Sequence, residues 1–598
     1  MIQTACGLDC YDACKIIGTQ KEGKLLLKGD STHPAGSEAL CRHLYRHLEE
    51  AERIEQPRID GKEVSLEEAL DAVAEAFGVE KKLLWRGSGN FGVMQEVTNL
   101  LMEKLGGTLT HGTLCDGAGD AGVLAGRGVN KMLPLESIKK AETVVVWGRN
   151  LTVTNPHMVP LLEGKKLIVI DPVKTAIAKK ADVHLQITPR TDYYMAILLA
   201  RFIFMEDSED ISWLEEFAPE FEDFYDYTRE HRIKAILAYM DVTLGDMGDV
   251  LEHLRHKRVV FLVGNGVQKY TTGASTLHAI DSLGATLGLF GKEGCGVHYF
   301  GHSQGGLSNP FKVALPTVSK VTTPFEQFQT VLVQGGNPAE SMPQSRRVRE
   351  SLAEVENLIY FGLYENETSA LAKIVIPAKN FLEKEDIRLS YAHHYVHPMH
   401  TLKESSIGVS EYAFTQALFE RLGLEGLASE EEYLEMWLSQ MQTKEGELIS
   451  PMYEPNPYCE GFGEEGGEPF EFIEEYDDDF INTKRFNRVR VSKKHQEVDE
   501  RFWLITPKSK DALNTQFHRT QEVEIHPDRG FKEGERVRVF SSEGEVELFV
   551  KWNEDLRLDS LLITSNTKGV NFLTPALVSD EGESACYQEI RVEVEPIA

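Results

Sequence analysis

The chain has no apolar segment long enough to cross a membrane. A spanning helix needs about 18 consecutive, mostly apolar residues, and the longest apolar runs, such as 144–147 and 167–170, are far shorter. Positive charge is also scarce, because 63 Lys and Arg oppose 95 Asp and Glu and leave a net charge of −32. Nucleic-acid binding and docking on anionic membranes both rest on basic surfaces. We therefore expect no nucleic acid and no direct membrane insertion.

Cysteine is scarce as well, and half of it is gathered at the beginning of the chain. Four of the eight cysteines, Cys6, Cys10, Cys14 and Cys41, follow the pattern C-x3-C-x3-C-x26-C. Soft thiolates at such spacing select zinc or an iron–sulfur cluster, and four of them suit a [4Fe–4S] cube. Zinc sites usually show two separated C-x2-C pairs, which this chain lacks. The spacing favours the cluster, with zinc second and disulfides third.

The remaining cysteines and the start of the chain bear on location. Residues 115, 295, 459 and 586 are widely scattered cysteines, which is typical of a reduced, intracellular protein. Met1 stands five residues before Cys6, which leaves no space for a twin-arginine or secretory leader. We expect a cytoplasmic protein.

Most of the chain alternates between short apolar strands and helical periodicity. At 598 residues it exceeds the size that one core serves, so several domains are expected. Strand-like segments that run into Gly, Asn or Asp occur at 82–85, 143–147, 167–170, 259–263, 330–334 and 357–361, and helical segments occur at 65–77 and 94–105. This alternation predicts doubly wound parallel sheets. Anionic ligands bind at the carboxyl ends of such strands, where glycines let backbone N–H groups approach.

The last third of the chain has a different pattern. Periodicity fails between 436 and 491, where acidic runs occur at 464–465, 474–475 and 477–479, and we favour a solvated acidic linker. From 501 the pattern becomes rich in strands, at 502–506, 523–525, 535–540, 545–550 and 561–564.

The first cysteine segment carries a resemblance to a known family. It reads CGLDCYDAC and is followed by GDSTHPAGSEALCRH. This sequence resembles the N-terminal cluster domain of the dimethyl sulfoxide reductase family, whose members carry molybdenum or tungsten on two pyranopterins. Gly29-Asp30 and His33-Pro34 stand where that family has a GD-x-x-HP turn. His43 stands where the family usually has a lysine between cluster and pterin.

The resemblance covers nearly the whole chain and implies its architecture. The expected fold is α/β, with an N-terminal iron–sulfur subdomain, two intertwined doubly wound α/β domains and a C-terminal double-psi β-barrel. The expected domains are 1–48 for the [4Fe–4S] cluster, 49–435 for molybdopterin binding, 436–500 for the acidic linker and 501–598 for the barrel. In the family, a segment with Gly and aromatic residues at the linker position crosses to the last domain, which is the alternative to a solvated linker.

The resemblance also implies a metal ligand. Cys115 follows the first pterin loop at the spacing where the family places the ligand to its metal, and a thiolate suits Mo or W. A lone cysteine among small residues is otherwise a packed core residue, and this alternative stays open. Formate-oxidising relatives have a histidine directly after the ligand, whereas this chain has Asp116, which argues against formate. His111 and Asp116 are candidate proton carriers, and local hydrogen bonding is the alternative for both.

Two sets of loops resemble those that hold two guanine dinucleotides. The implied cofactor-binding residues are Gly148, Asn150, Asp171 and Asp192 in the first set, Gly336, Asn337 and Glu367 in the second, and Asn514, Gln516 and Asn571 in the barrel. Amide side chains suit a pterin because they both donate and accept hydrogen bonds. Arg190 replaces a family glycine beside Asp192, which predicts a narrower nucleotide pocket.

The leading hypothesis is a redox enzyme with bis-molybdopterin guanine dinucleotide, molybdenum or tungsten, and one [4Fe–4S] cluster. It would move two electrons, commonly with an oxygen atom, to or from a small-molecule substrate. The cluster would pass electrons to an electron-transfer protein or an iron–sulfur subunit. The alternative is a non-catalytic relay similar to the large iron–sulfur subunit of respiratory complex I, which would need neither a metal-ligand cysteine nor pterin loops. An iron–sulfur scaffold, the third class, would not need the barrel. The histidine-rich stretch 393–400 is more typical of a strand beside the site than of a metal tract.

Overall fold

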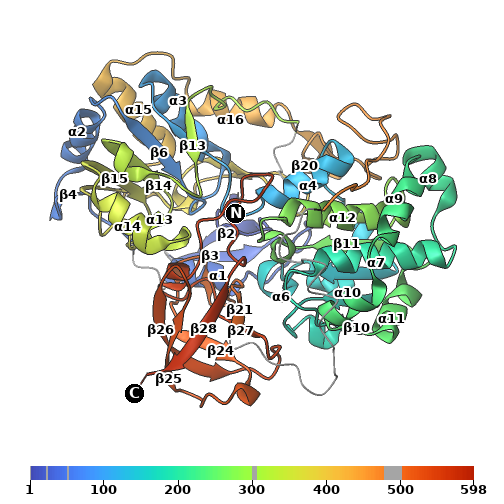
Figure 1. The fold of residues 1–598 in the computed structure, drawn as a ribbon. Helices are drawn as coiled ribbons and strands as arrows, with labels where there is room; N and C mark the ends of the chain where they lie inside the picture. The colour runs from blue at the N-terminus through green and yellow to red at the C-terminus, as the bar shows by residue number, and fades with distance from the viewer. Residues whose placement is uncertain (1, 22–23, 50–52, 300–305, 477–500, 598) are drawn as a thin grey trace.

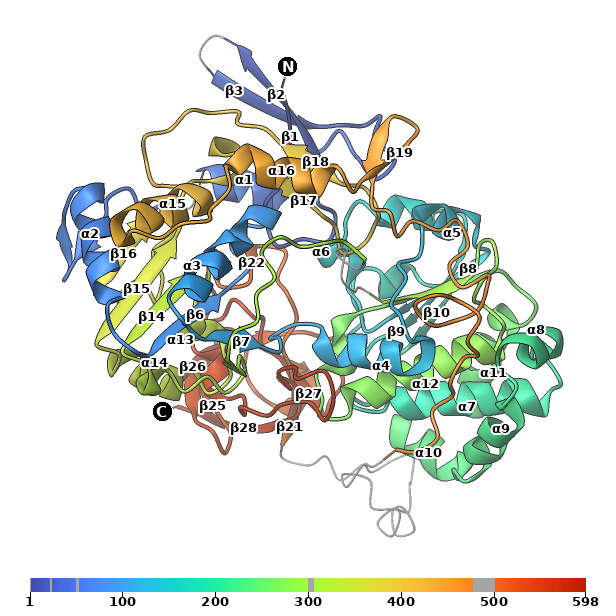
Figure 2. The same cartoon turned by 90° about the horizontal axis from the view of Figure 1, so that it is seen from above.

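The computed structural model describes residues 2–21, 24–49, 53–299, 306–476 and 501–597. Two α/β lobes, a small N-terminal sheet and a C-terminal barrel surround a common centre (Figure 1). In Figure 2 the N-terminal sheet lies toward the top and the barrel toward the bottom, with one lobe on each side. The N-terminal sheet is antiparallel and consists of β1 (Ile2–Ala5), β2 (Lys15–Lys21) and β3 (Lys24–Gly29), and α1 (Arg42–Glu49) follows it.

The larger lobe is built on a five-stranded, fully parallel sheet in the order β10–β9–β8–β11–β12. Its strands are β8 (Thr143–Trp147), β9 (Lys166–Ile170), β10 (Val183–Leu185), β11 (Val259–Val263) and β12 (Gly296–Tyr299). All residues of β8 and β11 are buried, because helices cover both faces. Strands buried on both faces form continuous apolar runs, and this is why the sequence predicts them so closely.

Helices of the larger lobe fall on the two faces of its sheet. One face packs against α4 (Gly117–Arg127), α7 (Asp192–Met205) and α12 (Gly273–Thr286), and this core extends to α8 (Ile211–Phe217), α9 (Phe221–Arg229), α10 (Ile233–Met240) and α11 (Leu244–Leu254). The other face packs against α5 (Leu135–Lys140) and α6 (Leu151–Thr154). Among the described residues, no helix has the length and apolar character that crossing a bilayer requires.

The second lobe carries a six-stranded sheet in the order β5–β4–β16–β15–β14–β6. Its strands are β4 (Arg58–Ile59), β5 (Lys62–Glu63), β6 (Lys82–Arg86), β14 (Thr330–Gln334), β15 (Asn357–Gly362) and β16 (Ile374–Pro377). One face packs against α2 (Leu66–Ala76), α3 (Thr98–Lys104) and α15 (Glu411–Leu422), and the other against α13 (Pro338–Ser341) and α14 (Ser345–Ala353). The expected helix at 65–77 is confirmed, and Ser65 forms its capping box with Glu68.

The two lobes are intertwined in sequence. The chain lays down β6, leaves to build the five-stranded sheet between 143 and 299, and returns to the six-stranded sheet at β14. Between these sheets, β7 (Leu109–His111) pairs in parallel with β13 (Thr317–Ser319). The expectation of two doubly wound α/β units is therefore consistent with the observed topology.

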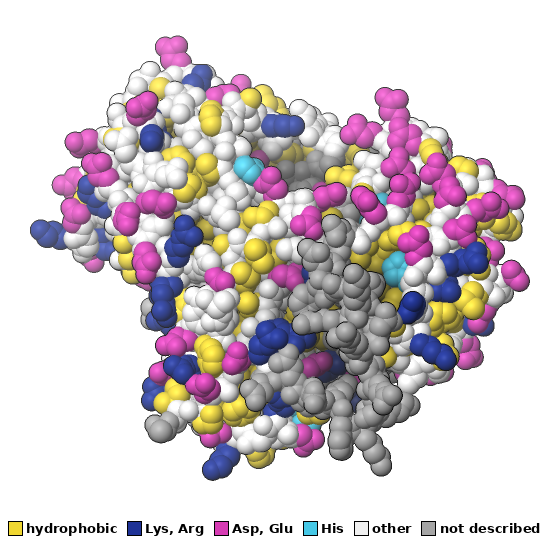
Figure 3. Space-filling model, viewed as in Figure 1, with side chains coloured by type: hydrophobic (Ala, Val, Ile, Leu, Met, Phe, Trp, Pro, Cys, Tyr) yellow, Lys and Arg dark blue, Asp and Glu magenta, His cyan; other side chains and the backbone are white. Residues whose placement is uncertain are grey.

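The C-terminal part is a closed six-stranded barrel in the order β21–β27–β24–β26–β25–β28. Its strands are β21 (Phe502–Ile505), β24 (Glu522–Ile525), β25 (Arg536–Phe540), β26 (Glu545–Trp552), β27 (Ser560–Leu562) and β28 (Arg591–Pro596). Five of these strands agree with the sequence-based segments, whereas β28 was not among them. Acidic side chains are spread over the visible face of both lobes, as the net charge of −32 requires (Figure 3).

Residues 436–476 differ from the solvated acidic linker that the sequence suggests. The segment contains the end of α16 (Glu430–Leu438) and a hairpin of β19 (Gln442–Lys444) and β20 (Glu447–Ile449). Beyond the hairpin, buried aromatic side chains such as Phe462, Phe470 and Phe472 join the core of the larger lobe. Aromatic burial outweighs the acidic composition here. The acidic run at 477–479 and the rest of the expected linker, to residue 500, lie outside the described residues.

Candidate functional site

A cavity of about 1500 Å³ lies where both lobes, the N-terminal part and the barrel meet. Loops that follow the carboxyl ends of β6, β8, β9, β11, β14 and β15 all line it. Because parallel strands end at the same edge of a sheet, each lobe presents its ligand-binding edge to this one cavity. A single small ligand usually occupies a pocket of about 300–1,000 Å³, so this cavity suits a larger group.

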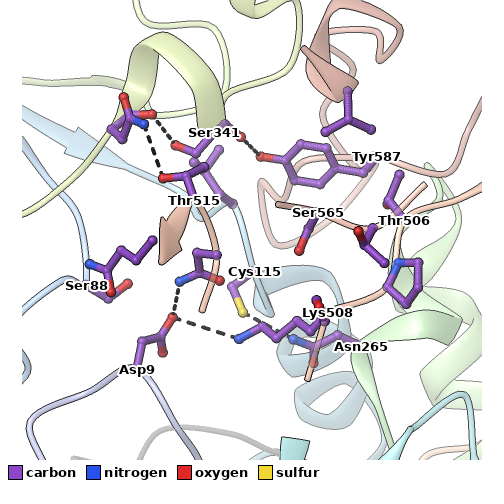
Figure 4. A pocket seen from close by; sticks show the side chains of 18 of the residues that line it. Asp9, Ser88, Cys115, Asn265, Ser341, Thr506, Lys508, Thr515, Ser565 and Tyr587 are labelled. Carbon is purple, nitrogen blue, oxygen red and sulfur yellow. Dashed lines mark hydrogen bonds and ion pairs between the residues drawn. The ribbon is translucent and has the colours of Figure 1, made fainter. Parts of the chain in front are cut away.

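Cys115 lies in the loop between β7 and α4, and its thiol faces the cavity (Figure 4). Thr113 shapes the loop, because its Oγ1 accepts hydrogen bonds from the backbone N–H groups of Cys115, at 2.6 Å, and Asp116, at 3.1 Å. The side chains of Gln268 and Lys269 both donate to the carbonyl oxygen of Cys115. The sequence alternative of a thiol packed in the core does not match this position.

The sulfur of Cys115 has one polar partner from the neighbouring strand end. Nδ2 of Asn265, in the loop after β11, lies 3.1 Å from Cys115 Sγ and also 3.1 Å from the Tyr11 hydroxyl oxygen. The cavity is deep, and this burial, together with the Asp116 carboxylate, raises the pKa of Cys115 to about 11. The thiol is therefore protonated in the cofactor-free protein at neutral pH. A bound metal would ionise it.

The two candidate proton carriers occupy different places. Asp116 lines the cavity, and its carboxylate accepts a hydrogen bond from Thr113 Oγ1 at 3.3 Å. His111 is not among the lining residues, and its ring nitrogens contact Thr317 Oγ1 at 2.8 Å and Glu583 Oε2 at 2.5 Å. Because His111 is committed to these two partners on a partly exposed strand, only Asp116 is in a position to reach a group bound at Cys115.

The four N-terminal cysteines surround one small region beside the cavity. Cys6 follows β1, Cys14 precedes β2, and Cys10 lies between them in the loop that joins the two strands. Cys41 precedes α1. Burial, and next the neighbouring Cys41 thiol, raise the pKa of Cys6 to about 12. Burial, next the Asp12 carboxylate and then the surrounding thiols also raise the pKa values of Cys10 and Cys14. As thiolates the four cysteines would repel each other, so a cationic centre would be needed to stabilise them.

The distances between the four thiols do not match those of a site for a single metal ion. In a tetrahedral zinc site every sulfur lies about 2.3 Å from the metal, so the sulfurs crowd together. Within the described part of the chain, no three His, Cys, Asp or Glu side chains are close enough to hold one metal ion. The thiols are thus near enough to influence each other but too far apart for one ion in this structure, and the same holds for the histidine-rich stretch 393–400.

The first set of loop residues lies at the carboxyl ends of β8 and β9 and at the start of α7. Gly148 has a φ of 57°, and a Cβ there would lie 2.6 Å from Val267 Cγ1, so the close turn requires glycine. Burial raises the pKa of Asp171 to about 7 and that of Asp192 to about 6. Asn150 precedes α6 and lines the same part of the cavity. Two buried carboxylates beside a glycine turn can accept hydrogen bonds from ribose or guanine.

Arg190 adopts the backbone conformation of the glycine that it replaces. Its φ is 72°, in the left-handed region. The side chain does not line the cavity, because Nε donates to Glu589 Oε1 of the barrel at 2.7 Å. The narrower pocket that the substitution suggests is therefore not found.

The second set of loop residues follows β14 and β15. Asn337 donates from Nδ2 to Glu367 Oε2 at 2.8 Å, which ties the two loops together. Glu367 is also paired with Arg519 of the barrel at 3.4 Å. Gly336 packs so closely on β6 and the loop after it that a Cβ would lie 2.4 Å from Trp85 Cζ3 and 3.1 Å from Gly87 Cα. Glycine therefore lets the main chains of these two loops lie close together at the edge of the cavity.

The three barrel amides differ in how many of their hydrogen bonds the protein already satisfies. Asn571 donates to the carbonyl oxygens of Glu340, at 2.8 Å, and Ser341, at 3.2 Å. Asn514 donates to Asp9 Oδ2 at 2.9 Å. Gln516 Oε1 is buried and has no hydrogen-bond partner among the described residues, so it can accept a hydrogen bond from a ligand.

Sequence reasoning missed several cavity residues near Cys115. Nζ of Lys508, in the loop after β21, lies 4.0 Å from Asp9 Oδ2. Burial lowers the pKa of this lysine, but Asp9 and the nearby thiols raise it, and the net shift is upward. Lys320 also lines the cavity, and burial lowers its pKa to about 8. Asn265 could have been found from the sequence, because it lies in a Gly-Asn-Gly turn directly after a strand. His43 does not line the cavity, and burial lowers its pKa.

Comparison with known proteins gives consistent results. A family model described as molybdopterin oxidoreductase matches residues 53–403. The protein named Probable oxidoreductase YoaE of Bacillus subtilis is 24% identical, over 100% of this chain and 98% of its own. The F420-dependent formate dehydrogenase subunit alpha of Methanocaldococcus jannaschii is 23% identical over 64% of this chain and 65% of its own. The structure of acetylene hydratase from Pelobacter acetylenicus superposes with a TM-score of 0.78 at 14% identity and covers 100% of both chains, which shows a shared fold.

Proposed function

Because the chain belongs to the molybdopterin oxidoreductase family, we propose that it holds molybdenum or tungsten on two pyranopterin guanine dinucleotides. We further propose that one [4Fe–4S] cluster relays electrons between this metal and an electron-transfer protein or iron–sulfur subunit. The cavity at the meeting of both lobes carries the proposal, since two phosphate-binding edges converge on it.

The residues of both edges fit such a cofactor. Asp171 and Asp192 offer buried carboxylates to one nucleotide, and glycines at 87, 89 and 336 let the loops after β6 and β14 pack together at the edge that would hold the other. The unpaired Gln516 Oε1 suits a ring that donates hydrogen bonds. Asn571 lines the cavity but already uses its amide within the protein, so we assign it to shaping the Ser341 loop.

We assign the direct metal ligand to Cys115. When bound, the metal–pterin group supplies two-electron chemistry, in oxygen-atom transfer or dehydrogenation of a small molecule. The Asn265 amide directs a hydrogen bond to the sulfur and holds its position, while Gln268 and Lys269 fix the backbone of Cys115. Asp116 is the residue that holds or moves a proton beside this sulfur.

The cluster assignment uses the four N-terminal thiols. The C-x3-C-x3-C-x26-C spacing, which lacks the paired C-x2-C motif of zinc sites, favours a polynuclear cluster over zinc. We place the cluster-binding subdomain at 1–48, the two dinucleotide-binding units at 49–435 and a double-psi barrel that closes the cofactor at 501–598. A pterin-free relay would leave the Cys115 thiol, which faces the cavity, and the unpaired Gln516 Oε1 without a role.

Composition analysis of anaerobically purified protein tests the proposal. We expect about four irons, about one Mo or W, and about two guanine nucleotides with pterin per chain, because each edge binds one dinucleotide. Cys41→Ser should lower the iron content, whereas Cys459→Ser, a change at an exposed and isolated cysteine, should not. Zinc in place of iron would overturn the cluster. A full cluster without pterin, in protein from a host that makes the cofactor, would favour the relay.

A further inference from the structure

Arg388 is a buried cation that the proposed function does not yet use. It ends β17 (Asp386–Arg388), which pairs with β18 (His397–Met399), and its side chain is 1% exposed. The guanidinium donates to three backbone carbonyls of the C-x3-C loop, those of Cys6 at 3.2 Å, Leu8 at 3.2 Å and Cys10 at 2.8 Å. One planar group therefore fixes the course of the chain between two of the four clustered cysteines.

Aromatic rings hold the guanidinium in this position. It lies over the ring of Phe91, 4.5 Å from the centroid, and beside Tyr391 at 5.8 Å. The backbone N–H of Phe91 donates to the carbonyl of Gly7 at 2.7 Å, so the ring and the cysteine loop are attached to each other. Arg388 consequently has little freedom to swing away from the cysteines.

Arg388 also lacks an anionic partner of its own. No carboxylate of the described residues lies within salt-bridge distance of its guanidinium, and the acceptors of its three hydrogen bonds are neutral backbone carbonyls. Arg127, which is buried to the same extent, is paired with Asp281. A buried charge without a counter-ion is strongly unfavourable, so an anion in the space beside the cysteine loop would stabilise Arg388.

We propose that Arg388 is a positioning residue for the cysteine loop and supplies the fixed positive charge that sets the reduction potential of the cluster. This inference rests on the proposed cluster. Reduction by the proposed electron-transfer partner would add one electron, and therefore one negative charge, to the bound cluster, with no proton taken up and no bond broken. A fixed cation in a low-dielectric surrounding stabilises the more negative state, and Arg388 therefore makes the cluster easier to reduce.

The test measures the midpoint potential of the cluster by a redox titration followed by electron paramagnetic resonance. Arg388→Gln removes the charge but keeps a hydrogen-bond donor, and Arg388→Lys keeps the charge but loses the fork. We expect Arg388→Gln to weaken reduction at least tenfold, a fall of about 59 mV for a one-electron couple. Arg388→Lys should stay near the wild-type potential, and Arg127→Lys serves as a control at a paired buried arginine.

Each result supports or overturns the proposal. Arg388→Gln with full iron and an unchanged potential would overturn it, as would an equal fall in the Gln and Lys variants, because geometry rather than charge would then be responsible. If Arg388→Gln loses its iron, Arg388→Lys decides, and a tenfold weaker reduction in that variant overturns the proposal. Wild-type protein without iron would instead contradict the proposed function, and the two failures are thus distinct.

Discussion

Replacing Gly87 by alanine should separate the two loops that form the proposed second nucleotide edge. Gly87 follows β6, and its N–H donates to Gln334 O at 2.8 Å. A Cβ at this position would lie 2.5 Å from the carbonyl oxygen of Gly335 and 2.5 Å from Gly336 Cα. Both atoms belong to the main chain, so no side-chain rotation can relieve the contact. The loops after β6 and β14 must move apart.

The size of the effect follows from this overlap. Forcing one methyl group into a packed site destabilises a protein by about 1–3 kcal/mol. Restricting the unfolded chain by changing Gly to Ala offsets about 0.4–1 kcal/mol of this. If the remainder, at most about 2.6 kcal/mol, falls on the bound state, nucleotide binding weakens by up to about 70-fold, since 1.4 kcal/mol corresponds to a factor of ten.

Guanine nucleotide released per chain after gel filtration is the direct measurement, and the urea midpoint of the same sample reports stability. Gly248→Ala in α11 is the matched control, because no heavy atom lies within 4 Å of the added Cβ. Alanine also favours a helix over glycine by about 1 kcal/mol, so this control should keep its nucleotide and its stability. Gly87→Ala protein with wild-type nucleotide content and an unchanged midpoint would refute the reasoning.

Two further predictions concern Cys115 and Asp171. Cys115→Ala should remove one sulfur from the X-ray absorption shell of the metal and leave the iron content unchanged, and an unaltered shell would show that the thiol is not a ligand. The pKa of Asp171 is raised to about 7, so its contribution to stability is full below about pH 4 and is lost as the pH rises through 7. Urea midpoints of cofactor-free protein should fall over this window, and Asp171→Asn should flatten the fall; an equal slope in both proteins would contradict the assignment.

The cavity-lining residues that can be predicted from the sequence are those that a short local pattern marks. A strand such as β8 is an uninterrupted apolar run, and the glycine that ends it, Gly148, marks the ligand edge directly. The same pattern, an apolar strand followed by glycine or a small polar residue, predicts Asp171 directly after β9 and Asn337 in the loop after β14. Cysteine spacing likewise needs no tertiary information, because Cys6, Cys10 and Cys14 are neighbours in the chain.

The residues that sequence reasoning missed depend on contacts between distant segments. Arg388 donates a hydrogen bond to the carbonyl of Cys6, which lies 382 positions earlier in the sequence. Nothing in the sequence around Arg388 distinguishes it from a surface arginine. Lys508 reaches Asp9 from the first loop of the barrel. His111 was predicted to lie at the site because it is close to Cys115 in the sequence, but its ring does not line the cavity. The reason is that β7 directs the ring to Thr317.

The contact between Arg190 and Glu589 has a consequence for biosynthesis. A left-handed conformation is unfavourable by about 1–2 kcal/mol for a residue other than glycine, and here a carboxylate 399 positions later stabilises it. The same carboxylate accepts a hydrogen bond from the backbone N–H of Thr271 at 2.9 Å. During synthesis the larger lobe emerges before Glu589, so the turn before α7 lacks this partner until the barrel has been made and has docked. The proposed nucleotide site at Asp192 would therefore be complete only after the C-terminal part of the chain is in place.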